Sequence, residues 1–540
     1  MPTMTFKQQV VLRWVPCVLV TAVVLAWSLN VVVHKPSLIL EMKDIRSLKQ
    51  TMGYPANETM VMVPYDQLEE IRREVSSGLR SAAAFLRTSL RDLSNTVKAS
   101  ANESVNSVLA EAEDRLRVIQ FDLSSIDQLG KLTDWRQKEA AILTQEVQRR
   151  IHALQNPMNC SNAKKIVCRM SRDGGAASLI HHLVYCIMAA YGSGKTFVLH
   201  SRGWRYSPDG WEVLFEPLSH TCVNISSGVI DPWPGTNESE AVMFPDWDRS
   251  EPKPAHQPMA VPVDIASRLQ RFHEMPSAWW VGQFISYMMR IRPEMQQIIN
   301  QVQMQLNFSH PIVGVHVRRT DKTSEAKLFP IEEYMIHVEN YYQSLDLKSP
   351  LGVPAHRRVF LASDQSSLIT EAKKKYQNYE FLWHKNNAEN MQNRYNLLSF
   401  KDFITELYFL AHSDFLVCTF SSNVCRLAYE MMQSVHADAP SRIISLDTNY
   451  FFHHARPRYL KVRFPHRPSK SAKKKGFLEA DAGENLASII RNVAETGYIQ
   501  VWDSRGGKAI KLIPDYKIRE VLDVVNVTVA ERATSERQRP

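Results

Sequence analysis

The segment Trp14–Val33 contains no charged residue and is apolar along most of its length. A run of roughly 20 such residues is what a helix needs to cross a bilayer. Lys7 and Arg13 precede the run, and no acidic residue occurs before Glu41. Basic residues stay on the cytoplasmic side, so we expect a cytoplasmic tail over 1–13, a signal anchor over 14–33 and a luminal remainder. A cleaved secretory signal is the alternative, which the length of the run disfavours.

Cysteine usage and charge agree with a luminal chain. Cys17 lies in the apolar run, and the spacings of the other six cysteines form no zinc pattern. We therefore expect an oxidising compartment. The net charge of +9 suits an anionic ligand, and the membrane anchor separates the chain from nucleic acid. Seven Asn-x-Ser/Thr sequons also fit a lumen: Asn57, Asn102, Asn159, Asn224, Asn237, Asn307 and Asn526.

Between Leu68 and Ile126 apolar residues recur at steps of three and four, as in Leu79, Leu86 and Leu90. Such spacing places one stripe on a helix, and a stripe of this length needs a partner helix to cover it. We expect a stem with coiled-coil helices over residues 34–156 that forms a homodimer. Packing of the stripe against the body of the same chain is the alternative.

After Asn156-Pro157 short apolar runs alternate with helical patterns. Four runs read as buried strands, and alternation of this kind predicts α/β units with parallel sheets. These runs begin at Phe197, Ile312, Val359 and Asp414. We expect an open-sheet α/β domain over 157–310 and a Rossmann-like domain over 311–465. Ligands bind such sheets at the carboxyl ends of the strands.

The end of the chain differs from this α/β region. Short strand-like pieces over residues 466–525 are separated by an acidic turn and a Gly turn, with Trp502 between the turns and a Pro-x-Tyr pattern ending at Tyr516. That order is loosely typical of an SH3-like β-barrel. Residues 526–540 are expected to be a C-terminal tail.

Several short motifs resemble metal or nucleotide sites. Gly192–Thr196 looks like the end of a P-loop, but it precedes its strand, so we interpret it as a turn. Asp246-Trp-Asp248 has a form that can hold Mg²⁺ or Mn²⁺ on a diphosphate. Because an arginine pair elsewhere can neutralise phosphates, we expect no metal here. The pairs His181-His182 and His453-His454 point their side chains in different directions, so we interpret them as structural.

The most informative segment is Pro311–Pro330, PIVGVHVRRTDKTSEAKLFP. A buried strand there delivers Arg318, Arg319, Lys322 and Glu325 into one loop. Guanidinium forks bind phosphate oxygens bidentately without a metal, which suits the departing diphosphate of a nucleotide-sugar. Glu325 is the candidate base for a sugar hydroxyl, and Lys322 can hold phosphate or tune the pKa of that carboxylate. A solvated loop with internal ion pairs is the alternative.

Four ordered motifs together resemble the eukaryotic α1,6-fucosyltransferases that make core fucose. They are His316–Lys322, Trp204–Tyr206 with Gly210–Glu212, Ala278–Trp280 and Cys418–Arg426. The resemblance runs from the anchor through the stem to the SH3-like end. It implies an inverting transfer of fucose from GDP-fucose to the innermost GlcNAc of N-glycans. It further implies a Golgi type II membrane protein with a two-part GT-B-like body and no cofactor or metal requirement.

The resemblance also implies roles for individual residues. Arg318, Tyr206 and Ser422 would contact the diphosphate, and Glu325 would be the base. His316, Asp364 and Glu406 would face the guanosine. Asn423, Val424, Cys425 and Arg426 would line the donor site, while Arg172, Asp248 and Asn423 would contact the acceptor. The implied disulfides are Cys160–Cys222, Cys168–Cys186 and Cys418–Cys425.

Three departures from the family pattern bear on these roles. The loop between Lys322 and Glu325 is one residue shorter, Gln365 replaces an Asp, and Glu406 also replaces an Asp. They motivate a second hypothesis, a catalytically silent lectin or scaffold of the same fold. A protein O-fucosyltransferase using the same donor is a third, which the stem and the SH3-like end disfavour.

Overall fold

The computed structural model describes nine stretches of the chain. They are residues 64–96, 99–170, 174–223, 229–319, 326–349, 352–385, 395–489, 496–503 and 509–527. The expected tail and anchor, residues 1–33, lie outside these stretches. Within them, no helix has both the length and the apolarity that crossing a membrane requires.

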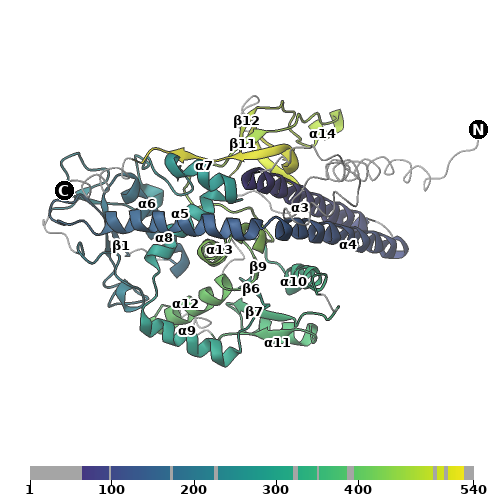
Figure 1. The fold of residues 1–540 in the computed structure, drawn as a ribbon, viewed down its shortest axis with the longest axis horizontal. Helices are drawn as coiled ribbons and strands as arrows, with labels where there is room; N and C mark the ends of the chain where they lie inside the picture. Colours follow the sequence, from purple (N-terminus) through teal and green to yellow (C-terminus); the bar gives the residue numbers. More distant parts are fainter. Residues whose placement is uncertain are drawn as a thin grey trace, which may run out of the picture.

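Three long helices follow one another at the start of the described chain: α3 (Tyr65–Thr96), α4 (Ala99–Leu129) and α5 (Leu132–Gln155). Helices α3 and α4 pack side by side (Figure 1). The stripe residues Leu68, Leu79 and Leu116 are buried. Packing within one chain therefore covers the predicted stripe at these positions.

A buried charge network joins the three helices. The Glu69 carboxylate, on α3, is fully buried and accepts hydrogen bonds from Arg72 (2.7 Å) and from Arg136 of α5 (2.6 Å). Arg136 also donates to Asp127 of α4, at 2.8 Å. A buried charge that loses its partner costs several kcal/mol, on the order of 3–5, so this network fixes how the helices pack.

The first sheet has the strand order β2-β1-β4-β3, and all its pairs are parallel. Its strands are β1 (Lys165–Arg169), β2 (Thr196–His200), β3 (Asp231–Pro232) and β4 (Ala241–Met243). Helix α6 (Ala176–Gly192) packs on β1 and β2. The segment from Gly192 to Thr196 is a turn between α6 and β2, as predicted.

The second sheet, which we call the donor sheet, has the order β10-β9-β6-β7-β8 and is also parallel. Its strands are β6 (Val313–Val317), β7 (Arg358–Ser363), β8 (Glu380–Leu382), β9 (Phe415–Cys418) and β10 (Ile443–Ser445). Its helices are α10 (Ile331–Asp346), α11 (Ser367–Lys375), α12 (Leu397–Ala411) and α13 (Asn423–Val435). The prediction of parallel α/β units, with strands at all four predicted positions, is confirmed.

One hydrophobic core runs through both α/β parts. It includes Leu143 of α5, Ile166 of β1, Leu407 of α12 and Leu427 of α13. Helices α7 (Val263–Phe272), α8 (Pro276–Met288) and α9 (Pro293–Leu306) lie between the two sheets in the sequence, and α8 packs on α6 and α13. The other face of the donor sheet has its own core under α10. All three disulfides implied by the resemblance are present.

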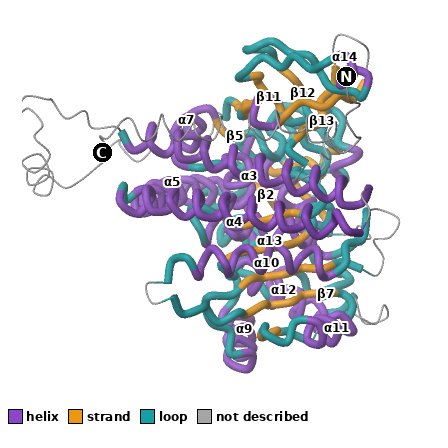
Figure 2. Tube along the Cα trace, turned by 90° about the vertical axis from the view of Figure 1, so that its right-hand side faces the viewer, coloured by secondary structure: helices purple, strands orange, loops and turns teal. Residues whose placement is uncertain are grey.

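A small β unit occupies one end of the molecule (Figure 2). Strands β11 (Tyr459–Val462), β12 (Asn485–Ala487) and β15 (Ile518–Val521) form one antiparallel sheet, and β13 (Tyr498–Asp503) pairs with β14 (Ala509–Pro514). Both sheets contribute to one core. The short helix α14 (Lys470–Lys474) follows β11, and β16 (Val524–Val525) pairs with β5 (Val261–Pro262).

This β unit packs against helix α3. Arg519 donates to Glu70 at 2.8 Å, and the ring of Phe85 meets that of Tyr498 edge-on at 6.3 Å. Ser81 bonds to Asp515, whose pKa is raised by burial. Strand β11 precedes residue 466, so the unit takes one strand from the segment that the sequence assigned to the preceding domain.

We expect two Gly→Ala changes to have opposite effects on stability, because Gly282 of α8 lies against α13 whereas Gly78 of α3 has open space around it. A Cβ on Gly282 would lie 2.5 Å from the carbonyl oxygen of Glu430, and overpacking of this kind costs about 1–3 kcal/mol. Gly78, inside α3, has open space around its Cβ position, and alanine there gains about 0.5–1 kcal/mol of helix propensity. We expect chemical denaturation to show Gly282→Ala destabilised and Gly78→Ala stabilised. Equal effects would contradict the packing described.

Candidate functional site

Three of the expected site residues lie where two neighbouring strands of the donor sheet end. Strand β6 ends at Val317 and continues into Arg318 and Arg319, while β7 ends at Ser363 and continues into Asp364. Val317 and Ser363 are register partners. The parallel pairing therefore brings two cations and a carboxylate together at the carboxyl edge, where α/β sheets bind ligands.

Asp364 holds both arginines at this edge. Its Oδ2 lies 3.3 Å from Nε of Arg318, and its Oδ1 accepts a hydrogen bond from the backbone N–H of Arg319 at 2.9 Å. The Arg319 guanidinium donates to Glu371 of α11 at 3.2 Å. Lys375, and after it Arg319, hold the pKa of Glu371 below its usual value. Two forks were expected at the diphosphate, and the structure gives each a carboxylate partner: the Arg318 side chain is 25% exposed beside Asp364, and that of Arg319 is 20% exposed beside Glu371.

The start of α13 forms the next part of the edge. Ser422 is its N-cap residue, and the Cys418–Cys425 disulfide ties the end of β9 to the first turn of the helix. A helix N-terminus presents backbone N–H groups and a partial positive charge, which favour anions. The expected donor-lining run Ser422–Arg426 is thus placed at the carboxyl edge of the sheet.

Within that run the side chains divide into two groups. Cys425 is fully buried, and Arg426 is nearly so, with its guanidinium 4.2 Å from the ring centroid of Phe451. Arg426 also donates to the Phe420 carbonyl at 2.5 Å and bonds to the Asn423 side chain. Cys425 and Arg426 therefore hold the turn, while the half-buried side chains of Asn423 and Val424 lie nearer the surface.

Sequence reasoning missed Asp447, which follows β10 at the same edge. Its carboxylate accepts hydrogen bonds from the hydroxyl of Ser445 (3.0 Å), from the backbone N–H of Thr448 (2.7 Å) and from that of Ser421 (3.3 Å). It therefore fixes the turn that precedes α13. A polar residue directly after Ile443–Ser445 was the available signal, but a run of two isoleucines and a serine is too short to stand out as a strand.

The two expected guanosine contacts other than Asp364 lie on the α12 side of the sheet. His316 alternates with Val315 and Val317, so it faces α12 rather than α10. Gly314, two residues earlier, lies close to α12, since a Cβ there would lie 3.4 Å from the Leu410 side chain of that helix. Glu406 is buried on α12, one turn nearer the carboxyl edge than Leu410. His316 and Glu406 are thus on one face of the sheet.

Tyr206 stands where the two α/β parts meet. Its ring packs against Trp204 (5.1 Å between centroids), Tyr395 (5.4 Å) and Phe400 of α12 (5.8 Å). Its hydroxyl donates to the carbonyl of Gly174 at 3.3 Å. Tyr206 therefore links the open sheet to the donor part.

Three expected residues lie outside the described stretches: Arg172, Lys322 and Glu325. The residues on either side of the segments that contain them are described. Arg319 is the last described residue before the loop with Lys322 and Glu325, and Gly174 follows Arg172. The acceptor candidate Asp248 is exposed in the 3₁₀ turn Trp247–Arg249 of the open-sheet domain.

The pair His181-His182, which we interpreted as structural, is buried. His181 bonds to the buried Glu430, and His182 packs edge-on against Trp247. In the described stretches one group of three metal-type ligands comes together, Cys168, His182 and Cys186. Its two sulfurs form a disulfide, so they are not thiolate ligands.

A parallel sheet with an arginine and a helix N-terminus at its carboxyl edge is typical of α/β proteins that bind phosphorylated ligands. Comparison with known proteins assigns the family. Residues 39–451 match the N- and catalytic domains of alpha-(1,6)-fucosyltransferases, and the chain belongs to this family.

Two relatives illustrate the extent of the match. The alpha-(1,6)-fucosyltransferase of Drosophila melanogaster is 36% identical over 478 residues, covering 86% of this chain and 75% of that protein. That of Caenorhabditis elegans is 35% identical over 337 residues, covering 61% of this chain and 60% of that protein. The crystal structure of fucosyltransferase NodZ from Bradyrhizobium is 14% identical with a TM-score of 0.31, over 50% of this chain and 92% of that one. The family assignment rests on the sequence matches.

The contacts of Asp364 predict that replacing this residue weakens phosphate binding. Asp364→Asn removes the charge that holds Arg318, and a partly exposed ion pair contributes about 1 kcal/mol, or about fivefold in affinity. We expect calorimetry to show weaker binding of both GDP and inorganic diphosphate. Gln365→Ala is the control, because that side chain bonds to Ser367 instead. Loss of GDP binding with unchanged diphosphate binding would mean that Asp364 serves the guanosine alone.

Proposed function

We propose that this chain transfers fucose from GDP-fucose, in α1,6 linkage, to the innermost GlcNAc of Asn-linked glycans. The observation that carries the proposal is Arg318, held by Asp364 at the carboxyl end of the central strand in a member of this family. Relatives named alpha-(1,6)-fucosyltransferase support the linkage. The carboxyl edge also contains the N-terminus of α13, which suits a diphosphate.

The reaction needs charge stabilisation and a proton acceptor. As the bond from fucose C1 to the β-phosphate oxygen breaks, its electron pair stays on the phosphate, and Arg318 is the guanidinium placed to bind that oxygen. The GlcNAc 6-hydroxyl oxygen then bonds to C1 from the opposite face, with inversion. We assign its proton to Glu325 and a phosphate contact to Lys322. No metal is required in this scheme.

The remaining roles follow the arrangement of the edge. His316 and Glu406 share one face of the donor sheet, which suits a guanosine pocket. We retain Arg319, whose guanidinium donates to Glu371, as the second fork at the diphosphate. On the acceptor side we propose Arg172, Asp248 and Asn423. Tyr206, at the junction of the two parts, is suited to contact the bound diphosphate.

We also propose a Golgi membrane protein with a luminal catalytic body. The three disulfides support an oxidising compartment, and the apolar run Trp14–Val33 supports a single anchor. The packed helices α3 and α4 support a helical stem, for which we retain a coiled-coil homodimer. The antiparallel strands around one small core support an SH3-like fold for the C-terminal unit.

Enzymatic assay of the luminal fragment, residues 34–540, tests this function directly. We expect fucose from GDP-fucose to appear on O6 of the innermost GlcNAc of a biantennary N-glycan. Linkage analysis of the product is the measurement. Fucose on a protein hydroxyl would favour the O-fucosyltransferase hypothesis, and absence of transfer with intact GDP binding would favour a silent scaffold.

Glu325→Gln is the decisive variant in the same assay. It keeps the shape of the side chain but cannot accept the proton, and a positioned base contributes about 10² to 10⁴ in rate. GDP affinity should stay at the wild-type value. Near-full turnover of this variant would show that another group, such as Asp321 or water, accepts the proton.

A further inference from the structure

Three sequons precede parallel strands at corresponding positions. Asn159 comes before β1, Asn237 before β4 and Asn307 before β6, and all three side chains are exposed. Each sequon therefore lies at the amino end of its sheet. Arg318 follows the carboxyl end of β6, and the acceptor candidate Asp248 follows the carboxyl end of β4, to which β1 is parallel. The sequons therefore lie at the opposite, amino ends of these strands.

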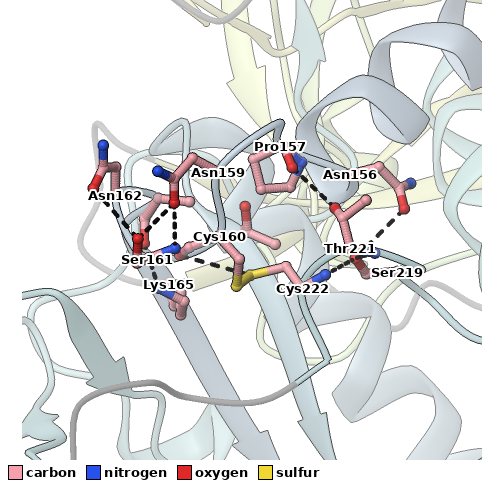
Figure 3. Close-up of a disulfide and its surroundings, with 12 residues drawn as sticks. Asn156, Pro157, Asn159, Cys160, Ser161, Asn162, Lys165, Ser219, Thr221 and Cys222 are labelled. Atoms are coloured by element: carbon pink, nitrogen blue, oxygen red, sulfur yellow. Dashed lines mark hydrogen bonds between the residues drawn. A yellow bond between two sulfur atoms is a disulfide. The ribbon is translucent and has the colours of Figure 1, made fainter.

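The geometry of Asn159 is the most informative. Its Oδ1 accepts hydrogen bonds from the backbone N–H of Ser161 (3.0 Å) and from the Ser161 hydroxyl (2.5 Å). Figure 3 shows these bonds, with the amide nitrogen of Asn159 turned away from the Cys160–Cys222 disulfide. A group attached to that nitrogen would extend from the surface without displacing the disulfide.

The other two sequons lie in comparable turns. Asn237 precedes Ser239 in a tight turn, and its carbonyl bonds to the Lys164 side chain, so the turns before β1 and β4 are neighbours. Asn307 is the C-cap residue of α9, with φ at 51°, and the Ser309 hydroxyl donates to its carbonyl at 3.3 Å. Both side chains project from the surface rather than into a core.

The order of synthesis leaves Asn159 accessible even though Cys160 is later bonded. Cys222 follows Cys160 by 62 residues. At roughly 5–20 residues per second, this delay is roughly 3–12 s, during which Cys222, the final partner of Cys160, has not yet been made. The sequon can therefore be modified before the disulfide closes.

We propose that Asn159, Asn237 and Asn307 carry N-linked glycans at the amino ends of their strands, opposite the carboxyl ends that precede the donor and acceptor candidates. The inference rests on the luminal placement proposed above. In the reaction, Nδ2 of the asparagine loses one proton and bonds to C1 of an oligosaccharide. The bond from C1 to a lipid diphosphate breaks, and the diphosphate leaves with the electron pair. Glycans so placed shield the surface and leave the ligand edge open.

Expression of the full chain in insect cells tests the inference. Glycans are removed enzymatically in H₂¹⁸O, so that each modified asparagine becomes a labelled aspartate that peptide mass spectrometry identifies. We expect labels at these three positions, and loss of each label in Asn159→Gln, Asn237→Gln or Asn307→Gln. Asn162→Gln is the matched control, an exposed asparagine in the same turn as Asn159 without a sequon hydroxyl.

Two readouts distinguish failure of the glycan proposal from failure of the proposed luminal placement. A chain protected from added protease in intact microsomes, with none of the three positions labelled, overturns the inference alone. A chain that protease digests and that carries no glycan overturns the luminal placement and the inference together. The triple Asn→Gln variant, recovered folded, should transfer fucose at the wild-type rate. Lost turnover despite unchanged thermal stability would contradict the separation of glycans from the catalytic edge.

Discussion

A fully buried carboxylate, Glu430, fixes the helix on which the ligand edge depends. It accepts hydrogen bonds from Nε2 of His181 (2.8 Å) and from the hydroxyl of Tyr450 (2.7 Å). An unpaired buried carboxylate would cost several kcal/mol, on the order of 3–5, so α13 stays where both partners reach it. His181 belongs to α6 on the open sheet, whereas Glu430 belongs to the donor part. The two parts are thus joined at the helix whose N-cap residue is Ser422.

The ligand edge follows from this constraint. With α13 held, the Cys418–Cys425 disulfide and Asp447 fix the turn at its start, and parallel pairing of β6 with β7 sets Arg318 beside Asp364. Charge is therefore concentrated by the backbone arrangement rather than by one flexible loop. Preorganised charge of this kind stabilises a departing phosphate without reorganisation during the reaction. Arg318, beside Asp364 at the end of the central strand, is our principal candidate for that role.

Local patterns predicted the parts of the fold that depend on local chemistry. Buried parallel strands are continuous apolar runs, so β6, β7 and β9 were predictable, as was Arg318 at a strand end. Asp447 was missed because β10 has only three residues, one of which is polar. The pairing of Arg319 with Glu371 joins residues 52 apart in sequence, which no local pattern contains. Likewise, the stem stripe predicted that a partner covers it but not that α4 of the same chain does so.

The central claim is that Arg318, and not a metal ion, neutralises the donor diphosphate. Calorimetric GDP affinities of the wild type and of Arg318→Lys, each measured in EDTA and in Mn²⁺, test it most directly. Loss of a charge-assisted fork typically costs about 1.5–3 kcal/mol, roughly 10- to 150-fold in affinity. We predict equal wild-type affinity with and without Mn²⁺, and a loss of at least about tenfold for Arg318→Lys in both conditions. Wild-type binding that requires Mn²⁺, together with an unaffected Arg318→Lys, would contradict the account and favour Asp246 and Asp248 as metal ligands.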